Sequence, residues 1–305
     1  MKKILNKLTA FITLFCLSLG LCLINCSISV NAATYPTPTN TYNIYKLVRN
    51  ASKSGGCSDM VPQGICFAGD YLLITAYCKD NKHNSVIYVF NESDKSYFGT
   101  IKLPSKAHVG GVAYDCDREG NVWVAKGEGL GCFKYSKIKD CKNTVLELKS
   151  YLREVSLSYS ASTLCYDVKN DCLWVAQFET LNPLKSFARC YKVNNKKSTN
   201  PTLPYQFEIS VPLKTQGISV RGNNMLISTS YGRDKDSKMY SYTWDQSTKT
   251  KSNKKTEVLP PMSEGVVLGP SYAYVLYESV STEYYDTCKS PVEYFAQYKL
   301  STFGL

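Results

Sequence analysis

The chain has 305 residues, a formal net charge of +11 and 13 cysteines. This length is enough for one large hydrophobic core or two modest ones. The lysines gather in polar stretches such as residues 248–256, which is typical of solvated loops, so the charge does not predict a nucleic-acid partner. Attraction to an anionic cell wall or polysaccharide is consistent with this charge.

The first 32 residues have the layout of a secretory signal peptide. A lysine-rich start precedes an apolar stretch over about residues 8–28, and a small-x-small ending follows at residues 30–32. A retained membrane anchor is the alternative, because the apolar stretch is nearly long enough to span a bilayer. The cleavage pattern favours export, so we expect a secreted or cell-surface protein without a membrane segment after cleavage. A Pro/Thr-rich linker is expected at residues 33–41, followed by one domain at 42–305.

Ten of the 13 cysteines lie after the predicted signal peptide. An even number of cysteines in an exported chain predicts disulfide bonds, and buried thiols are the alternative in a reducing setting. The spacings contain no CxxC pair and no His-paired cluster, so a structural zinc site is not expected. No cofactor is identified from the sequence.

A strand, turn and strand pattern recurs along the chain. Residues 62–77 (PQGICFAGDYLLITAY) and 215–231 (TQGISVRGNNMLISTSY) are the clearest pair. Three further copies cover residues 108–129, 160–180 and 263–279, which gives five units of about 50 residues. Within each unit an alternating apolar segment meets a turn and a second run rich in Val, Ile, Tyr and Trp.

Further strand-like runs complete these units. Third strands are expected at residues 85–90, 131–136, 188–193, 238–244 and 292–300, and fourth strands at 99–104, 144–149, 205–213 and 256–261. The last unit lacks a fourth strand, whereas residues 42–49 form a strand that belongs to no unit. A closed ring, in which this N-terminal strand completes the last blade, explains the missing strand and the extra one. We therefore predict an all-β, five-bladed β-propeller of four-stranded antiparallel blades, a closed fold that removes exposed sheet edges. One short helical turn is expected at residues 149–155.

The segments DREGNVWVA (117–125) and NDCLWVA (170–176) resemble strand turns of NHL-type, gluconolactonase-type and streptogramin-lyase-like propellers. This resemblance implies the propeller fold. Trp123 and Trp174 stand at equivalent positions of these segments, so we expect them to pack between blades.

Antiparallel geometry places the start of each first strand and the end of each second strand at the same end of the ring. A ligand site is expected at this central mouth, where it would bind an extracellular glycan, peptide or small molecule. The candidate ligand-binding residues stand at these strand ends: Gln63, Tyr77, His108, Gln216, Tyr231, Arg233, Glu264 and Glu278. A monomer is expected, with no nucleic-acid partner.

Several of these residues also have a structural interpretation. Gln63 and Gln216 could serve only to hydrogen-bond the backbone of a neighbouring blade. The strand-start glycines are expected to allow close backbone approach near the axis. His83 lies in the polar loop KDNKHNS and is expected to be solvated.

An enzyme is the alternative function, with Glu264, Glu278 and His108 as candidate catalytic residues. The segments TQGIS, SEGVV and YES resemble motifs of plant-type glutaminyl cyclases, which implies site roles for Gln216, Glu264 and Glu278. Glu264 followed by Gly265 is similar to the metal-binding motif of gluconolactonase-like propellers, which implies a divalent cation, although no partner ligands are identified. A lactone- or glycan-cleaving hydrolase or lyase is a further alternative, although the inner-strand aspartates of five-bladed glycosidases are absent from the equivalent strand starts.

Overall fold

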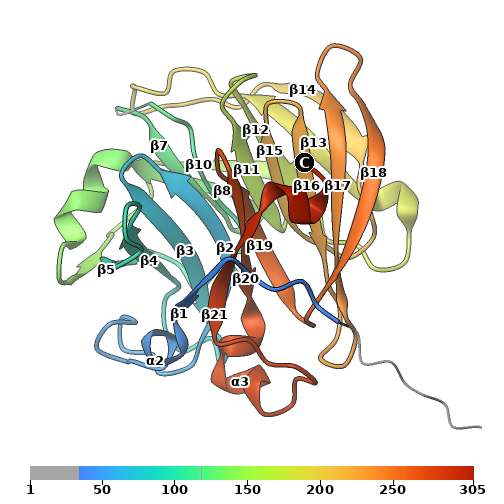
Figure 1. Cartoon of the computed structure of the whole chain (residues 1–305). Coiled ribbons are helices and arrows are strands. Elements are labelled where there is room, and N and C mark those ends of the chain that lie inside the picture. Colours follow the sequence, from blue (N-terminus) through green and yellow to red (C-terminus); the bar gives the residue numbers. More distant parts are fainter. Residues whose placement is uncertain (1–33, 118) are drawn as a thin grey trace, which may run out of the picture. The chain divides into compact units, whose positions relative to one another are not determined.

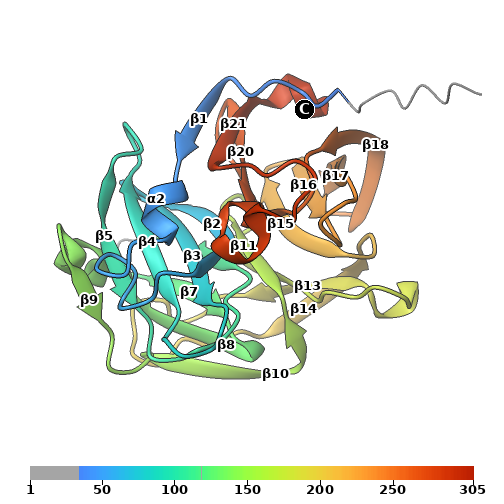
Figure 2. The same cartoon turned by 90° about the horizontal axis from the view of Figure 1, so that it is seen from below.

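The computed structural model describes residues 34–117 and 119–305, so the predicted signal peptide at 1–32 lies outside the described residues. Five sheets follow one another around a closed ring, and Figures 1 and 2 show the N-terminal strand β1 beside the C-terminal strand β21. The predicted five-bladed β-propeller is therefore confirmed. Within the described part, no helix has the length and apolar character needed to cross a membrane.

Each blade is a sheet of mostly antiparallel strands, in which the first-named strand lies nearest the axis. Blade 1 contains β2 (Met60–Ala68), β3 (Tyr71–Cys78), β4 (Val86–Asn91), β5 (Tyr97–Lys102) and β9 (Val145–Glu147). Blade 2 contains β6 (Val112–Tyr114), β7 (Asn121–Ala125), β8 (Gly127–Lys134) and β10 (Arg153–Ala161). Blade 3 contains β11 (Thr163–Asp167), β12 (Cys172–Ala176), β13 (Phe187–Lys192) and β14 (Tyr205–Ser210).

Blade 4 contains β15 (Thr215–Arg221), β16 (Asn224–Thr229), β17 (Ser237–Asp245) and β18 (Thr250–Leu259). Blade 5 contains β19 (Ser263–Leu268), β20 (Tyr272–Tyr277), β21 (Tyr294–Lys299) and β1 (Asn40–Asn43). Short helical segments lie between these strands, namely α2 (Tyr45–Val48), η1 (Tyr135–Cys141), η2 (Pro183–Lys185), η3 (Glu278–Val280) and α3 (Thr282–Tyr285), and η4 (Leu300–Phe303) follows the last strand.

The ring is closed by the N-terminal segment, as the surplus strand predicted. β1 pairs antiparallel with β21, and the Tyr42 hydroxyl donates to Gln297 Oε1 at 2.9 Å. The Tyr42 ring also stacks on Phe295 with centroids 4.9 Å apart. The strand is shorter than the expected 42–49, because the chain turns into α2 at Tyr45 and buries Val48 against blade 1.

Two expectations for the chain after β8 are wrong. Residues 145–147 form β9, which pairs in parallel with β5 and extends blade 1 rather than blade 2. The outer strand of blade 2 is β10, so the helical turn expected at 149–155 is replaced in part by extended chain. The physical reason is the position of η1, which buries Ile138 and Cys141 against blade 1. The chain that follows η1 therefore runs along blade 1 and covers the outer edge of that sheet.

The blades pack through large buried side chains. Trp123, Trp174 and Trp244 are fully buried, and Trp174 meets Trp244 edge-on between blades 3 and 4 with ring centroids 5.2 Å apart. This agrees with the packing role expected for Trp123 and Trp174. Near the axis, a Cβ atom on Gly64 would lie 2.8 Å from Gly111 Cα, so only glycine lets these neighbouring strands approach.

The ten cysteines of the described part are all free thiols, and nine of them are buried. The expected disulfide bonds are therefore not formed in this structure. Most of these thiols contribute as small apolar groups to the packing between strands.

Candidate functional site

A cavity of about 440 Å³ opens at one end of the ring axis. Its walls include seven of the eight residues predicted for a ligand site, namely Gln63, Tyr77, His108, Gln216, Tyr231, Arg233 and Glu278. They come together because the starts of β2 and β15 and the ends of β3, β16 and β20 lie at the same end of their blades. A cavity of this size is within the range typical of small-molecule sites.

Glu264, the eighth predicted residue, lies beneath the cavity rather than in its wall. Its side chain is buried in β19, with 1 % of its surface exposed, and it shares a hydrogen bond with Glu278. Burial, together with the neighbouring charge of Glu278, raises the pKa of Glu264 well above its ordinary value. Burial and the neighbouring charge therefore favour the protonated form of Glu264, which can share its proton with Glu278.

Glu278 is the member of this pair that faces the cavity. Burial raises the pKa of Glu278 to about 6, while hydrogen bonds from Gln63 and Glu264 act in the opposite direction. Gln63 Nε2 donates to Glu278 Oε2 at 3.1 Å and to the Pro62 carbonyl at 3.0 Å. The buried amide of Gln63 thus holds one carboxylate oxygen in place across the junction of blades 1 and 5.

Aromatic side chains line two separate parts of the cavity wall. On blades 1 and 2, Tyr77 packs against the His108 ring with centroids 4.2 Å apart. On blades 3 and 4, Phe178 lies 6.2 Å from Tyr231, whose side chain is 54 % exposed. The side chain of His108 is exposed to the cavity, but the protein atoms packed around it partly desolvate the ring, and this effect together with the nearby Lys79 lowers the pKa of His108 to about 4.

Arg233 is positioned by the segment inserted between β20 and β21. Its guanidinium donates to Glu283 Oε1 at 3.0 Å and to Thr287 Oγ1 at 2.8 Å. It also lies over the ring of Tyr284, 4.8 Å from the centroid. These contacts fix the guanidinium at the rim of the cavity, where it can meet an acceptor on a ligand.

Two important wall residues were missed by sequence reasoning. Phe178 follows the end of β12, and its backbone N–H donates to Ser162 Oγ at 2.9 Å. Tyr284 belongs to α3, and its hydroxyl accepts from Lys79 Nζ at 3.1 Å. Phe178 occupies the same post-strand position as Tyr231, a signal the repeat could have supplied, whereas Tyr284 lies in an insertion that no other blade shares across the described residues.

Two further glutamates near strand ends do not line the cavity. Glu128 is exposed, and Glu179 accepts from backbone N–H groups of its own loop. His83, expected from its polar loop to be solvated, is half-buried with its Nδ1 3.4 Å from Cys78 Sγ. His83, Cys57 and Cys78 lie close enough together to bind one metal ion. Within residues 34–117 and 119–305, no such group of potential metal ligands includes Glu264.

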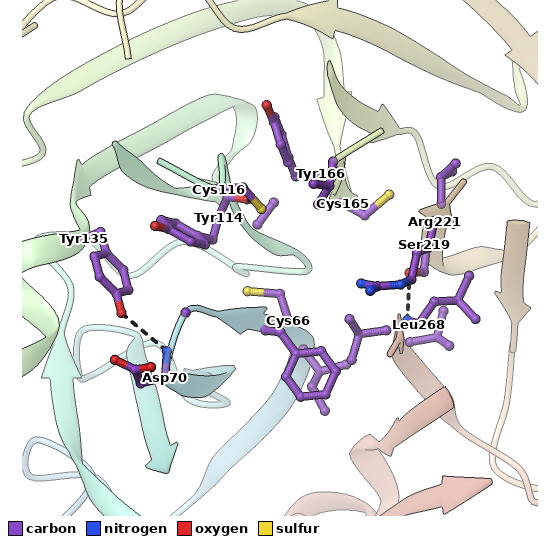
Figure 3. Close-up of a pocket in the computed structure, with 18 residues that line it drawn as sticks. Cys66, Asp70, Tyr114, Cys116, Tyr135, Cys165, Tyr166, Ser219, Arg221 and Leu268 are labelled. Atoms are coloured by element: carbon purple, nitrogen blue, oxygen red, sulfur yellow. Dashed lines mark hydrogen bonds between the residues drawn. The ribbon is translucent and has the colours of Figure 1, made fainter. Parts of the chain in front are cut away.

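A second cavity of about 340 Å³ opens at the opposite end of the axis (Figure 3). Its wall includes three thiols, Cys66, Cys116 and Cys165, together with tyrosine rings and Arg221. Among the described residues that line this wall, Asp70 alone carries a carboxylate, and its backbone N–H donates to Tyr135. Glu278, whose pKa is raised to about 6, and its partner Glu264 lie instead at the end of the axis where the cavity of about 440 Å³ opens.

No protein-family model matches the sequence, and no curated protein matches it significantly. Among solved structures, the chain is similar to the tail fiber of Staphylococcus aureus phage P68, with 12 % identity, a TM-score of 0.50, and coverage of 80 % of this chain and 51 % of that one.

Hydrazine synthase of Kuenenia stuttgartiensis matches with 10 % identity, a TM-score of 0.45 and coverage of 71 % and 55 %. A functionally unknown protein from Desulfotomaculum acetoxidans DSM 771 matches with 12 % identity, a TM-score of 0.42 and coverage of 73 % and 63 %. The chain thus spans between about half and just under two thirds of these proteins, and the likeness is one of fold.

Proposed function

We propose that this chain is a secreted binding protein that takes the end of a glycan into the cavity over Glu278. The observation that carries the proposal is the convergence of exposed aromatic rings with amide, guanidinium and carboxylate groups in one cavity of about 440 Å³. Sugar rings offer apolar faces that pack on aromatic side chains and hydroxyl groups that exchange hydrogen bonds with amides and carboxylates. A peptide end is the competing ligand of similar size.

The roles within the cavity follow from position. Tyr231 and Phe178 provide the accessible aromatic face, while Gln216 and Glu278 provide polar groups deeper in the wall. The Glu278 carboxylate accepts hydrogen bonds from ligand hydroxyl groups. Gln63 donates to Oε2 of the same carboxylate and so fixes its orientation. Arg233 donates at the rim.

A glycan array and a matched peptide array, probed with the mature chain, test the choice of ligand. The best hit is then titrated by calorimetry against Tyr231→Ala and Tyr205→Ala. The two tyrosines are equally exposed, at 54 %, but Tyr205 lies on β14 outside the cavity. We expect Tyr231→Ala to weaken binding about tenfold, which corresponds to ~1.4 kcal/mol, and Tyr205→Ala to leave it unchanged.

Equal effects of the two substitutions would show that the cavity is not the binding site. Hits confined to the peptide array would replace the glycan with a peptide and leave the site in place. No hit on either array would remove the binding proposal.

Acid–base catalysis is a second candidate, supported by the carboxyl pair. Burial raises the pKa of both Glu264 and Glu278, that of Glu278 to about 6, which brings the pair nearer to the range in which a group can donate and accept protons at neutral pH. Their direct hydrogen bond leaves no room for a scissile glycosidic bond between them, since glycosidase carboxyl groups stand at least about 5 Å apart. The pair therefore suits acyl transfer, as in the resemblance to glutaminyl cyclases, better than glycoside hydrolysis.

In that reaction the α-amine of an N-terminal glutamine attacks the side-chain amide carbon, and ammonia leaves as the C–N bond breaks. Glu278 would move a proton from the attacking amine to the departing nitrogen. Ammonia release from a peptide with N-terminal glutamine tests this, with Glu278→Gln as the variant and Glu128→Gln as the control. Loss of ammonia release in Glu278→Gln but not in Glu128→Gln would support catalysis. If the wild type releases no ammonia, the catalytic proposal is wrong.

A further inference from the structure

Two thiols and an imidazole converge on blade 1, outside the cavity described above. Cys57 lies in the turn before β2, Cys78 ends β3, and His83 stands in the β3–β4 connection. One ligand atom from each residue lies within 4.8 Å of the other two, and Cys78 Sγ is 3.4 Å from His83 Nδ1. Both cysteines are buried, and His83 is half-buried.

The local chain geometry holds these groups together. Met60 pairs with Cys78 in the β2–β3 ladder, which brings the preceding turn over the end of β3. Gly56 has a φ of +101°, and a Cβ atom there would lie 3.4 Å from His83 Cδ2, so the imidazole packs directly against this turn. The Asp59 backbone N–H donates to Cys57 Sγ at 3.4 Å, a contact that also stabilises metal-bound thiolates.

The 3.4 Å between Cys78 Sγ and His83 Nδ1 is close to the separation of two ligand atoms on a tetrahedral zinc ion, and the third ligand atom lies within 4.8 Å of both. Zn–S bonds of about 2.3 Å and Zn–N bonds of about 2.0–2.1 Å place neighbouring ligand atoms roughly 3.6–3.8 Å apart. A disulfide between the two cysteines would account for the thiols but would give the imidazole no partner. The Asp80 carboxylate lies beside this cluster, with Oδ1 3.9 Å from Cys78 Sγ, and its Oδ2 accepts from Lys82 Nζ at 2.6 Å.

We propose that Cys57, Cys78 and His83 form a binding site for a thiophilic divalent metal ion of the Zn²⁺ class. This departs from the expectation of no zinc site, which rested on sequence spacings alone. The ion would fix the turn that follows α2 to the end of β3. It would also anchor the segment carrying Lys79, which reaches Tyr284 at the cavity rim.

The test uses the full mature chain, stripped with a chelator and kept in a non-thiol reductant. Zn²⁺ and Co²⁺ are titrated into the wild type, Cys57→Ser, His83→Ala and the control Cys116→Ser, whose thiol is exposed at the opposite mouth. We expect one tightly bound ion in the wild type and the control, and affinity at least tenfold weaker in the other two variants. Bound Co²⁺ should give thiolate charge-transfer and tetrahedral visible bands, and Zn²⁺ should raise the melting temperature.

The variant His83→Ala keeps the test decisive if Cys57→Ser does not fold, because its side chain is only half-buried. The proposal is overturned if the reduced wild type binds no stoichiometric metal. Metal binding that persists unchanged in His83→Ala would overturn it too, as would a Cys57–Cys78 disulfide in the freshly purified chain, found by peptide mass mapping.

Discussion

Gln63 on β2 donates a hydrogen bond from Nε2 to Glu278 Oε2 at 3.1 Å, joining the first blade to the fifth at the floor of the cavity. Glu278 also contacts Glu264, so a buried amide and two carboxyl groups form one short chain of hydrogen bonds. The raised pKa values of these two carboxyl groups are the most informative property of the site, because they can be measured without knowing the ligand.

The first prediction concerns that hydrogen bond. Gln63 stabilises the ionised form of Glu278, so Gln63→Ala should raise the pKa of Glu278 above its value of about 6. Carbon NMR titration of the glutamate side-chain carboxyl groups measures this pKa directly. Gln216→Ala is the control, since it removes an equivalent amide on blade 4 and should leave the pKa in place. An unchanged pKa in Gln63→Ala would contradict the role assigned to the bond.

The second prediction concerns Glu264 and stability. Its pKa in the folded state is raised above the unfolded value of 4.5, so the folded chain binds more protons and loses stability as pH rises above about 4.5. Glu264→Gln keeps the shape and the hydrogen-bond donor without that cost. The variant should be more stable than the wild type at pH 8 and should differ less from it at pH 5.

Urea unfolding at the two pH values measures this difference. Glu128→Gln, an exposed substitution, should follow the wild type at both. The prediction is wrong if Glu264→Gln and the wild type lose the same stability between pH 5 and pH 8. That result would mean that the pKa of Glu264 is not raised in the folded state.

The third prediction concerns close approach at the axis. A Cβ atom on Gly64 would lie 2.8 Å from Gly111 Cα and 2.9 Å from Val112 N, both backbone atoms that cannot turn aside. Gly64→Ala should therefore unfold the chain or lower its stability by more than about 3 kcal/mol. At Gly222 the space around an added Cβ atom is open, but the φ of +64° is unfavourable for alanine. Gly222→Ala should therefore lower the stability by only about 1–2 kcal/mol. Equal losses in thermal melts of the two variants would argue against axial crowding.

The fourth prediction concerns ring closure. Tyr42 contributes both a stacked ring on Phe295 and a hydrogen bond to Gln297, whereas the neighbouring Thr41 side chain is exposed. Tyr42→Ala should lower the free energy of unfolding by about 2 kcal/mol, and Thr41→Ala by less than about 0.5 kcal/mol. Chemical denaturation gives both values. A negligible loss in Tyr42→Ala would show that the β1–β21 pairing alone closes the ring.

The fold could be read from the sequence because its signal is periodic and local. Each blade repeats an alternating apolar strand, a turn and a second strand, and this pattern depends only on neighbouring residues. The prediction failed at residues 144–149, where a strand was recognised but assigned to blade 2. Its partner β5 is chosen by the burial of Ile138 and Cys141 against blade 1, which is a contact between distant parts of the chain.

The sequence by itself determined the five blades, the closure by the N-terminal strand and the end of the ring at which Gln63, Gln216 and Glu278 gather, because antiparallel pairing fixes which strand ends meet. Tertiary structure alone decided that Glu264 is buried beneath the cavity, that Tyr284 reaches its wall, and that Cys57 and His83 meet at Cys78. The physical reason is that burial, proton sharing and ligand geometry depend on distances between residues far apart in the chain, which a repeat does not encode.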